Sequence, residues 1–203
     1  MFGDGVNARY LPAGEKIPEK HQLLIEFDDN SCIVCTVQMY GVLHAFTHGE
    51  NDNFYYHVAK TTRSPLSKDF DISYFEKIIS DTKPTLSVKA LLATEQRIPG
   101  FGNGILQNIL FISGINPKTK IKFLDSSDID RLFQNIKEIL LKMAENGGRD
   151  TEKDLFGNYG NYKTILSAKT YKEPCPVCGT AITKQAYLGG NIYFCPVCQP
   201  LKG

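Results

Sequence analysis

The sequence predicts an α+β protein with a β part over about residues 1–60, a helical part over about 70–170 and a cysteine-bearing tail. Three observations predict this class. Short apolar runs separated by turn residues come first, apolar residues with a helical period follow, and two Cys-x-x-Cys pairs lie near the end. The length of 203 residues allows one large or two small domains, and 42% hydrophobic with 22% charged residues is ordinary for a folded chain.

A β-hairpin is predicted near the start of the chain. Apolar stretches at 21–27 and 33–37 flank the sequence Asp28-Asp29-Asn30-Ser31, which is rich in turn-forming residues. Residues 42–46 and 54–58 are expected to form further strands, because they are also short apolar runs. Together these runs predict an antiparallel sheet in the first third of the chain.

The clearest helix is predicted from about Asp128 to Glu145. Its apolar residues recur every three or four positions and so form one face: Ile129, Leu132, Phe133, Ile136, Ile139, Leu140 and Met143. Ser127 provides a cap-like start, and Gly147-Gly148 a stop. Shorter helices are expected at four places: 73–80, 86–94, 103–113 and 162–168.

The tail carries a predicted metal site. Cys175-Pro-Val-Cys178 and Cys195-Pro-Val-Cys198 are separated by sixteen residues, and each pair can present two thiolates from one tight turn. Four cysteines complete a tetrahedral shell and leave no open position, so we expect one structural Zn²⁺ per chain. The alternative is two disulfides, which an intracellular setting disfavours.

A third pair with the same spacing, Cys32-Ile-Val-Cys35, is interpreted differently. It lies in a predicted strand, where positions i and i+3 point to opposite faces of the sheet. The two thiols would therefore diverge. We expect them to pack in the core rather than to bind metal or to act in redox chemistry.

Charge and hydropathy narrow the classes of function. Residues 1–81 carry a net charge of −5 and residues 82–203 a net charge of +6. This asymmetry is compatible with contact of the second part with a polyanion, and equally with two solvated surfaces of opposite sign. No apolar run approaches the roughly 18 residues of a membrane span. The first residues show no secretory signal pattern, so we expect a cytoplasmic protein.

A glycine-rich loop precedes the helix predicted at 103–113. Gly100, Gly102 and Gly104 do not fit the dinucleotide-binding fingerprint, but they let an anion approach the N-terminus of the helix. Asn103 adds a side-chain amide at the same place. This pattern predicts a phosphate contact by Gly102, Asn103 and Gly104.

The loop and the tail together resemble a known family. The loop 96–103, the stretch 110–117 and the cysteine tail ending at Gln199 are similar to the helix–two-turn–helix and zinc finger of the formamidopyrimidine-DNA glycosylase/endonuclease VIII (Fpg/Nei) family. The resemblance covers nearly the whole chain. It implies the rest of an N-terminal β-sandwich at 1–62, a helix–two-turn–helix domain at 63–170 and a zinc-finger hairpin at 171–203.

The resemblance also implies a function. Members of the family remove damaged bases from double-stranded DNA and cut at the abasic site, after the nucleotide has been flipped out of the duplex. Their nucleophile is an N-terminal proline amine, helped by a Glu and a Lys. These three residues have no counterpart in this chain, whose resemblance starts inside the family's β domain. We therefore expect either a fragment or a short form, and the catalytic residues stay unknown.

Further DNA contacts are carried over position by position. Gln38 and Tyr40 stand where the family has an Arg and a Phe that fill the space left by the flipped nucleotide. Gly190 stands where the family has a phosphate-gripping Arg, so Asn191 and Lys184 are the expected substitutes. Tyr162 ends a loop that matches the family's lesion-capping loop. An ordinary surface role for Tyr40 and for this loop stays open.

Three functions are compatible with these residues. The first is damaged-DNA binding and base-excision repair, as a DNA glycosylase and abasic-site lyase that works as a monomer. The second is a non-catalytic, zinc-dependent DNA-binding module. The third is a zinc-ribbon scaffold that binds protein, which the charge distribution and the Asn103 loop disfavour.

Overall fold

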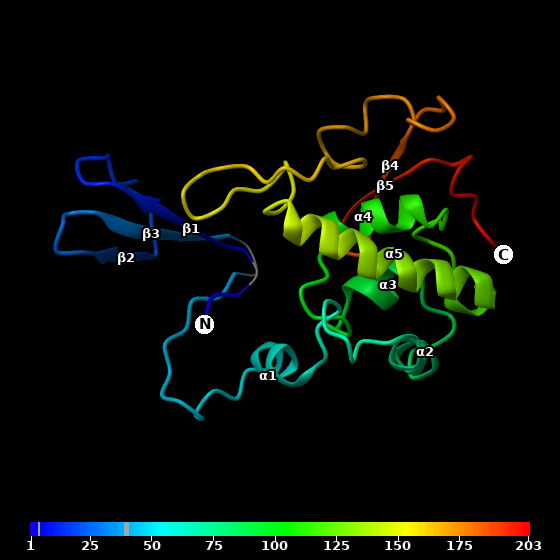
Figure 1. The fold of residues 1–203 in the computed structure, drawn as a ribbon, viewed down its shortest axis with the longest axis horizontal. Coiled ribbons are helices and arrows are strands. Elements are labelled where there is room, and N and C mark those ends of the chain that lie inside the picture. The colour runs from blue at the N-terminus through cyan, green and yellow to red at the C-terminus, as the bar shows by residue number, and fades with distance from the viewer. Residues whose placement is uncertain (4, 39–40) are drawn as a thin grey trace. The chain divides into compact units, whose positions relative to one another are not determined.

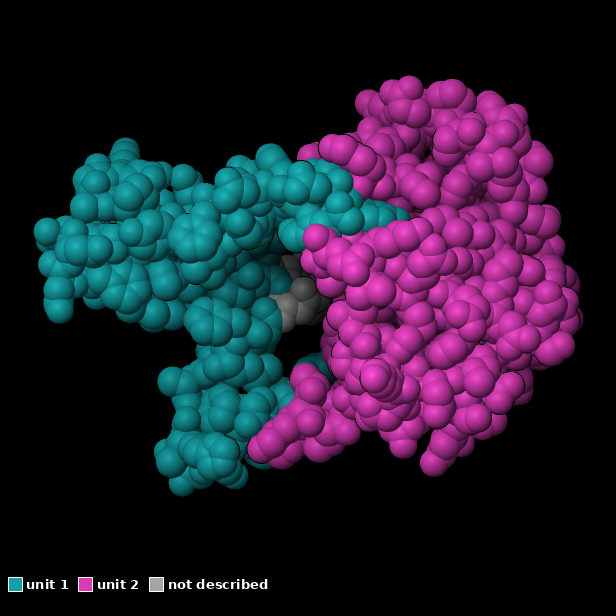
Figure 2. Space-filling model, viewed as in Figure 1, with its two compact units in different colours: residues 1–56, 146–162 teal, residues 57–145, 163–203 magenta. Residues whose placement is uncertain are grey.

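The computed structural model describes residues 1–3, 5–38 and 41–203, and it contains helices and small antiparallel sheets (Figure 1). Contacts divide the chain into two compact units, shown in different colours in Figure 2. Unit 1 comprises residues 1–56 and 146–162, and unit 2 comprises 57–145 and 163–203. The division into three domains that the sequence suggests stays a prediction.

Unit 1 contains a three-stranded antiparallel sheet in the order β1-β3-β2. The strands are β1 (Val6–Leu11), β2 (Leu23–Glu26) and β3 (Cys32–Val37). The predicted hairpin is confirmed: Asp29 accepts hydrogen bonds from Ser31, and Asn30 takes a positive φ of 64° in the turn. Strand β1 was not predicted.

The expected strand at 54–58 is wrong, because helix α1 (Phe54–Thr61) begins there. Asn53 explains the difference: its side-chain oxygen accepts hydrogen bonds from the backbone N–H groups of Tyr55 and Tyr56 and so caps a helix. The expected strand at 42–46 is reduced to one bridge between Leu43 and Phe2. A short apolar run did not distinguish a strand from a helix here.

The segment 146–162 of unit 1 packs on strand β1. The backbone N–H of Tyr10 donates to the carbonyl of Leu155 at 2.8 Å, and the ring of Tyr10 meets that of Phe156 edge-on. Within the segment, Gly160 lies against Gly148, where a Cβ would come within 2.1 Å of backbone atoms. Only glycine fits at position 160.

Unit 2 is built around four helices beyond α1: α2 (Ile72–Ser80), α3 (Val88–Ala93), α4 (Asn103–Ile112) and α5 (Ser126–Glu145). Asp71 caps α2 and Ser87 caps α3 through their side chains. These four helices confirm four of the five predictions. The helix expected at 162–168 is absent, because the backbone N–H of Ile165 instead donates to the side chain of Asn108.

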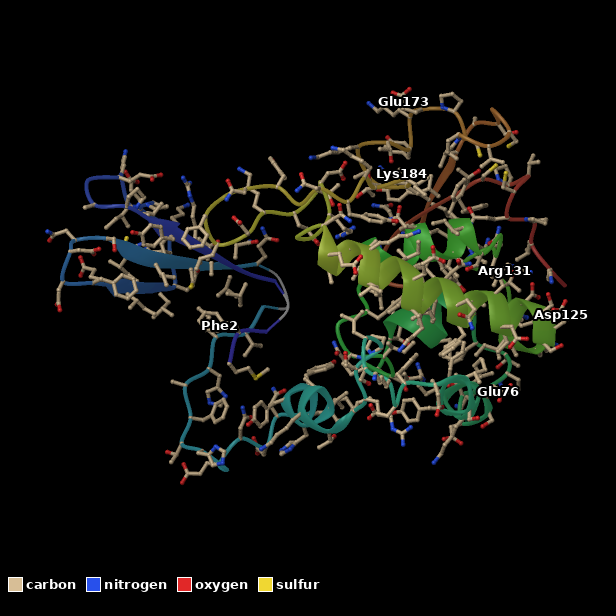
Figure 3. The ribbon with its side chains drawn as sticks, viewed as in Figure 1. Phe2, Glu76, Asp125, Arg131, Glu173 and Lys184 are labelled. Atoms are coloured by element: carbon tan, nitrogen blue, oxygen red, sulfur yellow. The ribbon has the colours of Figure 1, made fainter. Side chains whose placement is uncertain are left out.

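Helix α5 begins earlier than predicted. Its cap is Asp125, which accepts from the N–H of Asp128, while Asp128 accepts in return from the N–H of Asp125. The expected cap, Ser127, therefore lies inside the helix. Figure 3 shows Asp125 just before α5 and Arg131 on the helix, where Arg131 pairs with buried Asp128 at 2.5 Å.

Helices α4 and α5 pack together and are joined by two tight turns. Gly114 ends α4 with a positive φ of 66°, and the N–H of Ile115 donates back to Leu110. A short 3₁₀ helix, η1 (Ile121–Phe123), precedes α5. This is the helix–two-turn–helix arrangement that the resemblance implied.

The tail forms a hairpin of β4 (Thr183–Tyr187) and β5 (Gly190–Phe194), and β5 packs on α4. Leu188 and Gly189 both have positive φ, as a two-residue hairpin turn requires. Across the part of the chain described above, each helix is too short or too polar to cross a membrane.

Candidate metal centre and nucleic-acid interface

The four tail cysteines converge on one point. Their Sγ atoms all lie within 4.8 Å of one another, with 3.7 Å between Cys175 and Cys198 and 3.4 Å between Cys178 and Cys195. A disulfide needs about 2.05 Å, whereas tetrahedral Zn–S bonds of about 2.3 Å place sulfurs roughly 3.8 Å apart. The arrangement therefore fits a shared metal ion, and all four cysteines are free thiols.

Backbone turns hold each pair of cysteines in place. The N–H of Gly179 donates to Cys175 and the N–H of Cys175 to Thr180, with Gly179 at a φ of 74°. In the second turn, the N–H of Cys198 donates to the Sγ of Cys195 at 3.4 Å. These turns hold the two sulfurs of each pair on the same side of the loop.

The tail thiols do not all lose their protons at the same pH, because their pKa values shift in opposite directions. Hydrogen bonds from Thr180 lower the pKa of Cys178 to about 6, whereas the neighbouring thiols raise the pKa of Cys198 to about 12. Burial raises the pKa of Cys195. Four thiolates this close repel one another, and a divalent metal ion would supply the positive charge that compensates for this repulsion.

The other Cys-x-x-Cys pair behaves as predicted. Cys32 and Cys35 are both buried on β3, and Cys32 packs with Leu11 and Val34 on one face of the sheet. Burial raises the pKa of the Cys35 thiol. Among the described residues, only the tail cysteines group closely enough to bind a metal.

Helix α4 holds the hairpin through its amide side chains. Gln107 donates to the carbonyl of Asn191 at 3.0 Å and accepts from the N–H of Tyr193 at 3.1 Å, so it pairs with β5 as a neighbouring strand would. Gln107 itself is buried. The position of the hairpin is thus fixed by a residue on the helix that follows the glycine loop.

A second amide joins the cysteine turns to the helix–two-turn–helix. The side chain of Gln199 accepts from the N–H of Cys195 at 3.0 Å and donates to the carbonyl of Ile115 at 2.9 Å. Asn116 donates in turn to the backbone carbonyl of Gln199 at 2.9 Å. All of these groups are buried, so a buried hydrogen-bond network joins the cysteine turn to the turn after α4.

The N-terminus of α4 faces the tip of the hairpin. The side-chain amide of Asn103 donates to the carbonyl of Asn191 at 2.8 Å. Gly102 caps the helix without a side-chain bond, so the N–H groups of Asn103 and Gly104 in the first turn have no side-chain acceptor. A helix N-terminus of this kind favours an anion.

Lys89 meets Asn103 at the same place, and sequence reasoning missed it. A Cβ on Gly190 would lie 3.4 Å from the amide nitrogen of Asn103 and 3.8 Å from the Nζ of Lys89. Lys89 is only 2% exposed and donates to the carbonyl of Tyr187. The available signal was a single lysine inside the apolar run of α3.

Burial changes the pKa of Lys89. Desolvation lowers the pKa of the Lys89 ammonium, because the charged form loses its water. A bound anion would offset that loss. We call the group formed by Gly102, Asn103, Gly104, Lys89 and Gly190 the polar cradle.

The other predicted residues lie in different surroundings. Asn191 contributes its carbonyl to Asn103 and Gln107. Lys184 lies opposite Tyr193 on β4 (Figure 3), with its Nζ 5.0 Å from the ring centre of Tyr171. The cation beside Gly190 is Lys89, therefore, and Lys184 lies further along the hairpin.

Three predicted residues belong to the first part of the chain or to the loop. Gln38 follows β3, and its backbone N–H donates to Gly5 at 2.8 Å. Tyr162 pairs through its backbone with Gly148 and Asp150. Tyr40 lies outside the described residues. DNA contact by these residues stays a prediction.

In this structure, the first helix of a helix–two-turn–helix faces a four-cysteine hairpin. This combination is typical of a class of nucleic-acid-binding proteins. Comparisons with known proteins agree with that class. The family profile for the formamidopyrimidine-DNA glycosylase H2TH domain matches residues 62–154. A formamidopyrimidine-DNA glycosylase of Shouchella clausii is 27% identical over 200 residues, which are 97% of this chain and 71% of the relative. One from Prochlorococcus marinus strain MIT 9312 is 34% identical over 139 residues, 66% of this chain and 46% of the relative.

Solved structures show the same likeness. The Lactococcus lactis Fpg in complex with DNA containing an abasic site matches 97% of this chain and 72% of its own, with a TM-score of 0.77 and 26% identity. The Thermus thermophilus MutM (Fpg) protein shares the fold, with a TM-score of 0.78 and 20% identity. The chain is similar to the Fpg proteins over nearly its whole length, and it spans less than half of the Prochlorococcus relative.

Proposed function

We propose that this chain binds double-stranded DNA containing a damaged base or an abasic site and acts in base-excision repair. The observation that carries the proposal is the polar cradle, where Lys89, Asn103 and the start of α4 converge beside Gly190. A phosphate there would meet one cation, one amide and the free N–H groups of a helix. The proposal places the protein in the cytoplasm as a monomer, on the nucleoid if the cell is bacterial.

The metal in this proposal is Zn²⁺. Cys175, Cys178, Cys195 and Cys198 would hold it, with no ligand position left for substrate. The ion would stabilise the hairpin, and Gln107 and Gln199 would transmit that order to α4. The metal therefore has a structural role in DNA binding.

The chemistry, by family resemblance, is that of a DNA glycosylase and abasic-site lyase. The relatives are named as glycosylases, and the L. lactis protein was solved with abasic-site DNA. The proline nucleophile of the family has no counterpart in these residues. A non-catalytic DNA-binding module is the second candidate, because the contacts of the polar cradle and the four-cysteine site need no nucleophile.

Borohydride trapping tests the enzymatic part. The chain is mixed with a duplex that carries one abasic site, and borohydride is added to reduce any imine between a protein amine and the sugar. A covalent protein–DNA band would support the lyase, and peptide mapping would identify the amine. Binding without such a band would support the non-catalytic module.

The salt dependence of binding tests the DNA-binding part. Phosphate contacts release counterions, so affinity should fall steeply between 50 and 200 mM salt, conditions under which such complexes typically weaken by orders of magnitude. Affinity for an abasic-site duplex should exceed that for an undamaged duplex of the same sequence. Equal, salt-insensitive binding of both would contradict the proposal and favour the protein-binding scaffold.

A further inference from the structure

Basic residues without acidic ones are concentrated in three segments of unit 2. Residues 82–94, 113–124 and 183–194 contain no Asp or Glu, although the chain as a whole has a net charge of only +1. The three segments carry six lysines: Lys83, Lys89, Lys118, Lys120, Lys122 and Lys184. Where such segments meet, their charges add up to a surface that attracts an anionic partner.

Backbone hydrogen bonds bring the first two segments together. The N–H of Lys89 donates to the carbonyl of Pro117 at 3.1 Å. Further along, the N–H of Lys122 donates to the carbonyl of Pro84 at 3.0 Å. The two segments therefore lie side by side, beginning at the lysine of the polar cradle.

The three lysines of the second segment lie on one outward side. Burial alternates along this stretch, because Thr119 and Ile121 are buried, Lys120 and Lys122 are exposed, and Lys118 is half-buried. The buried residues fix the stretch to unit 2 and leave the lysines between them facing out. We call Lys118, Lys120 and Lys122 the lysine row.

The lysine row starts next to the polar cradle. The Nζ of Lys118 donates to the side-chain oxygen of Gln185 at 3.4 Å, and the Nζ of Lys89 donates to the carbonyl of Tyr187. Gln185 and Tyr187 are alternate residues of β4, so they lie about 7 Å apart along the strand. The row therefore continues the positive charge of the polar cradle.

The acidic residues nearest to the lysine row along the chain pair with other cations. Asp125 follows the row and lies 3.3 Å from the Nζ of Lys202. Glu95 precedes it and lies 2.5 Å from Arg97. The charge of the row is thus left for a partner, and its continuity with the polar cradle favours DNA over an acidic protein as that partner.

We propose that the lysine row binds backbone phosphates of the DNA duplex beyond the polar cradle, on one side of the lesion. This inference rests on the proposed function, because it takes the polar cradle as one end of the DNA-binding surface. The row spans at most about 14 Å. About four base pairs, at roughly 3.4 Å each, have that length. Contacts to phosphates extend the site without reading the base sequence.

The test removes the charge of the lysine row from the full, zinc-loaded chain. Lys118→Gln, Lys120→Gln and Lys122→Gln are combined, and affinity for an abasic-site duplex longer than two helical turns is measured by fluorescence anisotropy over a salt series. Each lost phosphate contact lowers the slope of log affinity against log salt by about 0.9. We therefore expect the slope to fall by about 2–3 and the affinity to fall at least tenfold.

A matched control removes the same charge elsewhere in unit 2. Lys68, Lys77 and Lys142 are also exposed, and their combined replacement by Gln should leave affinity and slope unchanged. Replacement of the lysine row by three arginines should also retain both, because arginine keeps the positive charge. Zinc content and circular dichroism show that each variant remains folded.

Hydroxyl-radical footprinting locates the contact on the duplex. At saturating protein, the unaltered chain should protect about four more base pairs on one side of the abasic site than the Gln variant of the lysine row does. Protection at the abasic site itself should be the same in both.

The outcomes separate this inference from the proposed function. If the unaltered chain binds the duplex but the Gln variant keeps the same salt slope, the lysine row does not contact DNA, and an acidic protein segment is favoured as its partner. Equal weakening by the control variant would also overturn the inference, because net charge alone would explain the loss. A chain that binds damaged and undamaged duplexes equally, with a slope that still depends on the row, would contradict the proposed function and support the row.

Discussion

The two regions with Cys-x-x-Cys spacing place their sulfur atoms differently. In the tail, tight turns bring Cys175, Cys178 and their partners within 4.8 Å of one another. In β3, Cys32 and Cys35 are extended residues that point to opposite faces and are buried. The spacing alone does not make a ligand pair. The backbone between the cysteines decides whether their sulfurs meet.

The two regions also differ in what depends on them. The tail cysteines are joined to α4 and to the turn after it through Gln107 and Gln199, so the hairpin, the metal site and the polar cradle are one structure. The cysteines of β3 contribute only packing. The following predictions range from the largest expected effect to the smallest.

Loss of the metal should unfold the hairpin. Cys195→Ser removes one ligand, so we expect bound zinc to fall from one per chain to nearly none, and the β4–β5 amides to exchange freely with solvent. A two-stranded hairpin has little stability of its own, and structural zinc contributes folding free energy directly. Metal analysis and hydrogen exchange measure both effects.

The control for Cys195→Ser is Cys32→Ala in strand β3, which should retain one zinc per chain. Zinc loss in that variant would mean that the two cysteine regions are not independent.

Removing the amide that joins the cysteine turn to Ile115 should cost about 2–6 kcal/mol. Gln199→Leu leaves the N–H of Cys195 and the carbonyl of Ile115 buried without partners, and each such group costs about 1–3 kcal/mol. Urea unfolding of the zinc-loaded protein, followed by circular dichroism, measures the change. The exposed Gln185→Leu is the control, with an expected change of at most about 0.5 kcal/mol.

Cys35→Ser should destabilise the sheet by about 1–3 kcal/mol without changing the zinc content. The thiol is fully buried, and a hydroxyl placed there would lack the partners that it had in water. Thermal unfolding measures the loss, and Thr36→Ser on the same strand is the control. An unchanged melting temperature would show that Cys35 is not part of a packed core.

Asn103→Ala should weaken binding to an abasic-site duplex roughly tenfold, which corresponds to about 1.4 kcal/mol. The substitution removes the amide that links α4 to Asn191 beside the expected phosphate. Fluorescence anisotropy at fixed salt measures the affinity. Asn103→Asp, which has nearly the same shape but carries a negative charge, should weaken binding further, and equal effects of the two variants would argue against a phosphate there.

The pH dependence of binding should be the smallest effect. Desolvation lowers the pKa of Lys89, so its ammonium loses its proton at a lower pH than an exposed lysine would. Phosphate favours the charged form, and affinity should therefore fall a few-fold as pH rises from neutrality through this lowered pKa. Lys89→Arg should bind with less dependence on pH, because arginine stays protonated throughout.

Much of this fold could be predicted from local signals. The hairpin turn at 28–31, the periodic face of α5 and the glycine loop before α4 are all specified by residues close in sequence. The four tail cysteines were predictable because their spacing occurs in two copies. Short apolar runs were less informative, since Asn53 turns the run at 54–58 into a helix by capping it.

The remaining parts of the site depend on long-range contacts. Lys89 meets Gly190 across about a hundred residues of sequence, and Gln107 pairs with Tyr193 across 86. A buried lysine in an apolar helix gives no indication of which carbonyl it will reach. The cap of α5 was misplaced for a different reason, because Asp125 and Ser127 are both suitable caps and only the reciprocal bonds with Asp128 select the first.

The most direct test of the central claim is the affinity for an abasic-site duplex before zinc removal, after it and after zinc is restored. The metal site and the polar cradle act together in this account, so we expect affinity to fall at least a hundredfold in protein shown to be metal-free, and to recover when zinc returns. Full affinity in the metal-free protein would contradict the account, because the cysteine tail would then have no part in holding DNA.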